Sequence, residues 1–275
     1  MKSILCALLI MLGLASPGAA AVVEIPDAGA VADVSLIGGW RLDNGHIMGA
    51  LRVTMAPGWK TYWRAGGGTG IPPRFDWANS ENLAGVTLHW PSPHLITVEG
   101  VTVIGYKNEL VLPIEFTPKV AGQDITARAR LQIGICKDVC IPASKNLSLS
   151  LKASATEPNF LIQLALADQP INPRAAGLNA RSCRLEKTED GYRLTGRFSL
   201  PHKGHKPEMV VFETPDPDIW IASATTSRKG ATLEARADMI SLSGKAFSPN
   251  PKALRITVIG EDQAIEMSGC RIARP

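Results

Sequence analysis

Beyond residue 21, the 275-residue chain has no apolar stretch approaching the roughly 20 residues that a membrane-spanning helix needs. Charged residues make up only 20% of the chain. The formal net charge is +4, and the Lys and Arg residues do not cluster into a basic stripe. A P-loop ending, a Gly-x-Ser-x-Gly motif and a zinc-like spacing of His and Cys are also missing. We therefore expect no membrane span in the mature chain, no nucleic-acid partner and no cofactor.

The first residues have the pattern of a secretory signal peptide. Lys2 gives a positive start, an apolar run follows over 4–15, and small residues over 16–21 suit cleavage near Ala20 or Ala21. The alternative is an uncleaved N-terminal anchor. We expect residues 1–20, with Cys6, to be removed, and the mature protein to reach an oxidising compartment where disulfides persist.

The remaining chain reads as mostly β, because short runs that alternate apolar and polar residues are separated by Gly, Pro, Asn and Asp. Such runs with turn signals between them are typical of a β-sandwich. In the first half, strands are predicted within 46–56, 85–90, 110–118, 124–136 and 146–153. In the second half, they are predicted within 191–200, 208–215, 219–228, 231–239, 253–261 and 264–272.

The strand pattern breaks after Lys152, which suggests a domain boundary. A short helix is predicted from about Asn159 to Asp168, stopped by Pro170; a plain linker is the alternative. We expect a first domain over 21–152, a helical linker over 153–176, and a second β-sandwich over 177–275.

Four cysteines remain in the mature chain, and this boundary places two in each domain. We therefore pair Cys136 with Cys140 and Cys183 with Cys270. In the loop-entropy model a bond closing about 88 residues stabilises by roughly 4.6 kcal/mol, and one closing about five residues by roughly 2 kcal/mol. The bond between Cys183 and Cys270 is thus suited to a structural role.

The segment GICKDVCIP, residues 134–142, leaves three alternatives open: a redox pair, a structural disulfide or a metal site. A short bridge in a tight loop stabilises little and is easily reduced, which favours redox chemistry. Lys137 favours a thiolate here and Asp138 opposes it. The loop should cap two strands and be accessible to another protein.

Four segments occur in an order that resembles a known family: GWKTYWRAGGGTGIPPRFDW (58–77), LHWPSPH (88–94), GYKNELVLPIEF (105–116) and GICKDVCIPA (134–143). Together they resemble the N-terminal periplasmic region of DsbD-type protein-disulfide reductases. The ScsB branch, linked with copper-stress tolerance, is the most similar, and the second half resembles the extra β domain of the longer ScsB-type proteins.

The resemblance implies two immunoglobulin-like β-sandwiches, a periplasmic location and one redox-active pair, Cys136 and Cys140. Cys140 matches the cysteine that forms mixed disulfides with thioredoxin-fold partners, and Cys136 would resolve them. The membrane and thioredoxin-like domains of the family have no counterpart in these 275 residues, so we expect a separate membrane electron transporter.

The family shields its pair with an aromatic residue in a cap loop, whereas the corresponding stretch here, 98–105, has none. The aromatic residues of GWKTYWR either pack in the core or form a contact surface. The residues that we expect to shield the pair or contact a partner are Tyr62, Trp63, Val101, Val103, Ile104 and Tyr106.

The alternative function is a non-enzymatic binding module, in one of two forms. In a copper-homeostasis form, reduced Cys136 and Cys140 hold Cu(I), which prefers soft thiolates. In the other form, both disulfides are inert and the surface only binds partners. His202, His205 and Met209 could add a weak copper site, although such clusters are usually incidental.

Overall fold

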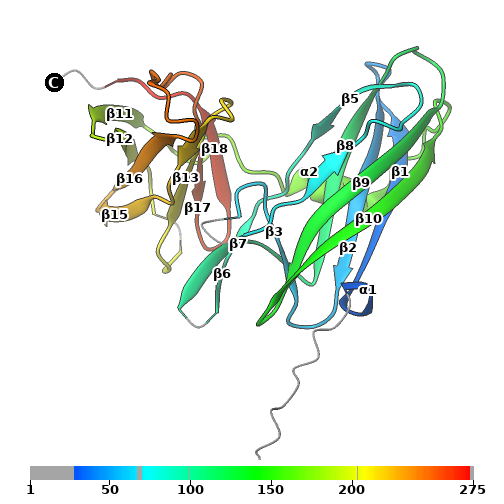
Figure 1. Ribbon diagram of the computed structural model, residues 1–275, viewed down its shortest axis with the longest axis horizontal. Coiled ribbons are helices and arrows are strands. Elements are labelled where there is room, and N and C mark those ends of the chain that lie inside the picture. Colours follow the sequence, from blue (N-terminus) through cyan, green and yellow to red (C-terminus); the bar gives the residue numbers. More distant parts are fainter. Residues whose placement is uncertain (1–27, 67–69, 99, 203, 273–275) are drawn as a thin grey trace, which may run out of the picture.

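The computed structural model describes residues 28–66, 70–98, 100–202 and 204–272. The expected signal peptide, its cleavage site and Cys6 lie outside the described residues. The described part is mostly β, and its strands form antiparallel sheets arranged as two sandwiches (Figure 1). The prediction of a mostly β protein is confirmed. Neither of the described helices is long and apolar enough to cross a membrane.

The first sandwich begins with a single helical turn, α1 (Ala28–Val31), and packs two sheets face to face. One sheet has the order β1-β2-β8-β5, formed by β1 (Ala32–Arg41), β2 (Ile47–Met55), β8 (Glu109–Pro118) and β5 (Leu83–Leu88). The other has the order β10-β9-β3-β7-β6, formed by β10 (Cys140–Leu151), β9 (Ile125–Cys136), β3 (Lys60–Tyr62), β7 (Val101–Lys107) and β6 (His94–Val98). Strand β4 (Arg74–Asp76) pairs with β9 beside this path.

Alternation along the strands places the core between these two sheets. In β9, every second residue from Ile125 to Ile133 is buried, while Arg128 and Arg130 are exposed. Strand β8 contributes Leu112, Ile114 and Phe116 to the same core, although the first two flank Pro113. The strands predicted within 110–118 and 124–136 are therefore found where the apolar pattern placed them, whereas β10 begins at Cys140, ahead of its predicted range of 146–153.

Several strands were not predicted. Strand β3 has only three residues, too few for a periodic signal, yet it joins β7 to β9 in the centre of the sheet. The family resemblance presents 98–105 as a cap loop, but residues 98 and 101–105 lie in the paired strands β6 and β7. The other strands that were missed are β1, β4, β6, β7 and β11 (Ala180–Lys187).

The predicted helix is present as α2 (Phe160–Ala167). The side chain of Asn159 caps its N-terminus by accepting hydrogen bonds from the backbone N–H groups of Leu161 and Ile162. Ile162 is fully buried against Met48 and Ala50 of β2. The segment is thus more than a linker, because its helix packs on the outer face of the first sandwich.

The second sandwich also has two sheets. One has the order β11-β12-β16-β14, formed by β11 (Ala180–Lys187), β12 (Gly191–Ser199), β16 (Thr232–Ser241) and β14 (Ile219–Ile221), and β15 (Thr225–Lys229) pairs with β16 as well. The other has the order β13-β17-β18, formed by β13 (Met209–Glu213), β17 (Arg255–Ile259) and β18 (Ala264–Ser268).

The two sandwiches meet through Arg64, which follows β3. Its guanidinium donates to both carboxylate oxygens of Glu213 at 2.8–3.2 Å and also to Glu266, and it lies 4.0 Å from the centre of the Trp63 ring. Ile259 and Ala264 of the second sandwich belong to the same buried cluster as the first core. An ion-pair network and apolar packing therefore connect the segment after β3 to the second domain.

Candidate functional site

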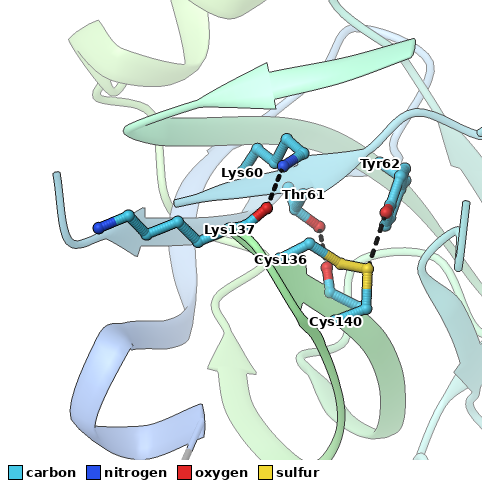
Figure 2. Close-up of a disulfide and its surroundings, with 7 residues drawn as sticks. Lys60, Thr61, Tyr62, Cys136, Lys137 and Cys140 are labelled. Carbon is cyan, nitrogen blue, oxygen red and sulfur yellow. Dashed lines mark hydrogen bonds between the residues drawn. A yellow bond between two sulfur atoms is a disulfide. The ribbon is translucent and has the colours of Figure 1, made fainter. Parts of the chain in front are cut away.

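The β9–β10 hairpin ends in a disulfide between Cys136, the last residue of β9, and Cys140, the first of β10 (Figure 2). The two cysteines are opposite one another in the strand register, with their Cα atoms 4.1 Å apart. Only Lys137, Asp138 and Val139 lie between them, and the N–H of Lys137 donates to the carbonyl of Val139 at 3.0 Å. The sequence places the pair at a tight turn, and the strand register brings the two side chains to one side of it.

The two cysteines differ sharply in exposure. Cys136 is 1% exposed and belongs to a small apolar cluster, whereas Cys140 is exposed, as are the three turn residues. An incoming thiolate needs an exposed sulfur and a line of approach. Solvent therefore reaches Cys140, whereas Cys136 is covered by its neighbours.

Strand β3 lies beside β9, and its side chains make hydrogen bonds to the backbone next to this turn. Lys60 is opposite Cys136 in the register, and its ammonium donates to the carbonyl of Lys137 at 2.8 Å (Figure 2). The hydroxyl of Thr61 donates to the carbonyl of Gly134 at 2.9 Å. Burial lowers the pKa of Lys60, an effect that Asp138 opposes and Lys107 reinforces. The end of β9 is thus fixed by two side chains of β3.

Tyr62 makes the direct polar contact with the disulfide. Its hydroxyl lies 3.0 Å from Sγ of Cys140, and it must be the donor because a disulfide sulfur carries no hydrogen (Figure 2). The side chain is 2% exposed, and burial raises the pKa of its phenol. The phenol therefore keeps its proton over the range in which thiols titrate and remains a hydrogen-bond donor.

Two glycines make room for the Tyr62 ring. A Cβ added at Gly70 would lie 2.6 Å from Cδ1 of Tyr62, and one added at Gly134 would lie 2.8 Å from Cβ of Ile71 and 3.3 Å from the ring. Gly70 is the last residue of the glycine-rich segment AGGGTG. In the structure, this glycine lets the backbone approach the aromatic ring beside the disulfide.

The β6–β7 hairpin covers the buried sulfur with aliphatic side chains. Ile96 and Val103 are opposite one another in the register, and both pack in the cluster that contains Tyr62 and Cys136. Val98 and Val101, two positions further towards the tip, lie on the same face and are exposed. The buried cysteine is thus covered by the aliphatic side chains of Ile96 and Val103, whereas the family resemblance implies an aromatic shield.

The other shielding candidates lie elsewhere. Trp63 and Ile104 are fully buried in the main core of the first sandwich. Tyr106 is also buried there, its hydroxyl donates to the carbonyl of Pro91 at 2.8 Å, and burial raises its pKa well above the usual value. The structure therefore brings Tyr62 and Val103 to the disulfide but not Trp63, Ile104 or Tyr106. Alternation along GWKTYWR could have separated Tyr62 from Trp63, because neighbouring residues of a strand point to opposite faces.

The second disulfide joins Cys183 of β11 to Cys270, two residues after β18. Both cysteines are buried in the core of the second sandwich, at 1% and 6% exposure. The bond ties the first strand of this domain to the segment after its last, over a sequence separation of 87. Its position suits a staple rather than an exchange site.

Among the weak copper candidates, the two histidines line one surface pocket, which Met209 does not line. His202 and His205 lie in an exposed loop, whereas Met209 packs against the core of the first sandwich. Within the ranges that the structure describes, no group of three or more His, Cys, Asp or Glu side chains is arranged to hold a metal ion.

Sequence reasoning missed Lys60, Thr61, Ile96 and the packing role of the glycines. A lysine is expected to be solvent-exposed, yet Lys60 is only 6% exposed. The sequence does hold a signal for this burial. Lys60 and Tyr62 are two residues apart and must share one face of any strand, so burial of Tyr62 implies burial of Lys60.

Comparison with known proteins agrees with this geometry. Residues 37–152 match the family model described as "Thiol:disulfide interchange protein DsbD, N-terminal", which confirms the resemblance for the first sandwich. A solved structure, the N-terminal periplasmic domain of ScsB from Proteus mirabilis, is 24% identical with a TM-score of 0.66. The alignment covers 91% of this chain and 97% of that one, so the likeness in fold extends over both sandwiches. No curated protein matches the chain.

Proposed function

We propose that this chain, whose first sandwich matches the DsbD N-terminal family, is a periplasmic thiol–disulfide interchange protein. It passes electrons through Cys136 and Cys140 to or from thioredoxin-fold partners. The observation that carries the proposal is the unequal exposure of one hairpin disulfide, with Cys140 open to solvent and Cys136 buried beside it.

Recharging of the pair begins when a thiolate of a dithiol donor attacks Sγ of Cys140. A mixed disulfide forms between the donor and Cys140, and the electron pair of the broken bond stays on Cys136 as a thiolate. The second thiol of the donor then attacks the donor sulfur of the mixed disulfide. The donor leaves as a disulfide, and Cys140 is released as a thiolate that takes up a proton from water.

Delivery of electrons to a partner reverses this sequence. The Cys140 thiolate attacks the partner's disulfide, and one partner sulfur leaves as a thiolate. Cys136 then attacks Cys140, which restores the disulfide and releases the partner's second sulfur. Two electrons move in each direction as thiol groups, so no bound cofactor takes part.

The surroundings of Cys140 support a protein partner. Val139 is 42% exposed in the turn itself, and Val98 and Val101 are 38% and 56% exposed at the tip of the β6–β7 hairpin. The end of β6, the start of β7 and the turn between β9 and β10 lie at the same end of the molecule (Figure 1). Exposed apolar side chains beside a reactive sulfur suit docking of a partner's active-site rim.

The periplasmic location is supported by the signal-peptide pattern of the sequence and by the periplasmic origin of the similar solved domain. We propose that the electrons reach this protein from a separate membrane electron transporter. The support for a membrane transporter as electron donor is the resemblance of this chain to the DsbD-type family.

A trapping experiment tests the mechanism. The Cys136→Ala variant, reduced and mixed with an oxidised thioredoxin-fold oxidoreductase, should accumulate a mixed disulfide through Cys140, because the resolving thiol is absent. The matched Cys140→Ala variant retains only the buried thiol and should form at least tenfold less adduct. Equal adduct from both variants, or none from either, would contradict the proposal.

The same variants separate this function from copper binding. Stoichiometric Cu(I) binding that requires both cysteines, together with absence of any mixed disulfide, would favour a copper module. The geometry offers two thiolates at most, since the described residues add no third Cys, His, Asp or Glu ligand.

A further inference from the structure

Among the residues that the structure describes, Lys60 is the one charged group buried beside the disulfide, and it has no part in the proposed mechanism so far. It is 6% exposed, and the hydrogen bond that the described residues give its ammonium goes to the carbonyl of Lys137. An ammonium can donate three hydrogen bonds, and burying one without a carboxylate within ion-pair distance is costly. Asp138 in the turn acts on Lys60 from beyond ion-pair distance and is exposed, so the ammonium lacks a buried negative partner among the described residues.

The strand register identifies that partner. Lys60 and Cys136 are directly opposite one another on β3 and β9, so their side chains leave the same face of the sheet. Cβ atoms of such a cross-strand pair lie about 4.5–5.5 Å apart. When the disulfide opens by attack on Cys140, Cys136 becomes a thiolate across the strand pair from Lys60, and its residue is buried among Tyr62, Ile96 and Val103.

We propose that Lys60 stabilises the thiolate of Cys136 electrostatically, as a positioning residue of the exchange reaction. The inference rests on the proposed function and deepens it. A donor thiolate attacks Sγ of Cys140, the bond between the two sulfurs breaks, and its electron pair remains on Cys136 opposite the ammonium. In the reverse direction, the same ammonium keeps Cys136 ionised for its attack on the mixed disulfide.

The other charged groups near the pair are less well placed for this role. Lys137 is next to Cys136 in sequence, but it is exposed, and its side chain lies against Gly58, where an added Cβ would be 3.3 Å from Cε. Lys107 is opposite Lys60 on β7 and is exposed. Asp138 in the turn is exposed and acts against a thiolate, as does burial of Cys136 itself. Tyr62 donates to Cys140 rather than to Cys136.

The experiment uses the Cys140→Ala variant, with the bond between Cys183 and Cys270 intact, so that Cys136 is the free thiol. Its pKa is read from thiolate absorbance during a pH titration. We expect a pKa below the ordinary thiol value of about 8.5, although burial alone would raise it. Addition of Lys60→Met should raise the pKa by at least one unit, and Lys60→Arg should keep it close to that of the parent.

Lys107→Met is the charge-matched control, because it removes one exposed positive charge from the opposite position of β7. It should change the pKa by less than a third of the change from Lys60→Met. In the protein with both cysteines, and at a pH above the Cys136 pKa of both proteins, Lys60→Met should shift the equilibrium with a dithiol reference about tenfold towards the disulfide.

A Cys136 pKa above the ordinary thiol value in the Lys60 protein would overturn the inference, and this result needs no Lys60 variant to fold. Equal shifts from Lys60→Met and Lys107→Met would overturn it as well. These measurements use no protein partner. An unchanged pKa in a protein that still traps partners therefore refutes the role of Lys60 alone, whereas failure of trapping with a shifted pKa refutes the exchange function alone.

Discussion

The hydroxyl of Tyr62 gives a prediction whose magnitude follows from the structure. It lies 3.0 Å from Sγ of Cys140, and burial raises the pKa of the phenol, so the hydroxyl stays protonated while the thiol titrates. A hydrogen bond to a charged group contributes about 1.5–3 kcal/mol. The lower end applies here because Cys140 is exposed to solvent. About 1.5 kcal/mol corresponds to roughly one pKa unit.

We therefore expect Tyr62→Phe to raise the pKa of the Cys140 thiol by about one unit. The assay is the pH dependence of the alkylation rate in the Cys136→Ala background, where Cys140 is the free thiol of the mature protein. A neutral thiol accepts a hydrogen bond less strongly than a thiolate does. The free energy of unfolding of Tyr62→Phe should therefore fall by only about 1 kcal/mol where the thiol is neutral.

Tyr106→Phe is the matched control. Tyr106 is buried like Tyr62, but its hydroxyl donates to the carbonyl of Pro91 and not to a sulfur. This variant should leave the alkylation pKa unchanged. An unaltered pKa in Tyr62→Phe, or equal shifts in the two variants, would refute the assignment of the Tyr62 hydroxyl to the thiolate.

Three further predictions concern the shield, the domain interface and the second disulfide. Val103→Ala removes two buried methyl groups and should cost about 2 kcal/mol of stability in urea unfolding, while a small thiol reduces the hairpin disulfide faster. Arg64→Met leaves Glu213 without its bidentate partner at the domain interface and should destabilise by about 3 kcal/mol, whereas an exposed-pair control, Arg52→Met, should cost less than about 1 kcal/mol. Replacement of Cys183 and Cys270 by Ala should lower the unfolding free energy by about 4.6 kcal/mol and leave partner trapping by the first domain intact. A loss of stability under 1 kcal/mol in Val103→Ala or Arg64→Met would contradict these assignments. So would abolished trapping in the variant without Cys183 and Cys270.

Sequence periodicity predicted the parts of the fold that depend on long, regular strands. Strand β9 was predictable because its apolar residues alternate over the whole length, and α2 because Asn159 and Pro170 bracket an apolar run. Strand β3 was not, since three residues carry no period, and its place in the sheet depends on pairing with β7 and β9.

Within the candidate site, the disulfide itself was predictable, but the groups around it were less so. Cys136 and Cys140 follow from spacing and domain boundaries. The burial of Lys60 and the contact of Tyr62 with sulfur depend on how β3 lies beside the hairpin, which residues far apart in the sequence decide. The ion pairs of Arg64 span 149 and 202 residues, a separation over which a single sequence gives no pairing signal.

The central claim is that the hairpin disulfide is the labile one of two bonds in the same molecule. A redox titration followed by mass spectrometry of both cysteine pairs tests it directly, with the buried bond between Cys183 and Cys270 as the internal reference. We predict a potential well above about −300 mV for Cys136 and Cys140 and one below it for Cys183 and Cys270. A hairpin bond below about −300 mV, or joint reduction of both pairs, would contradict a role in thiol–disulfide exchange.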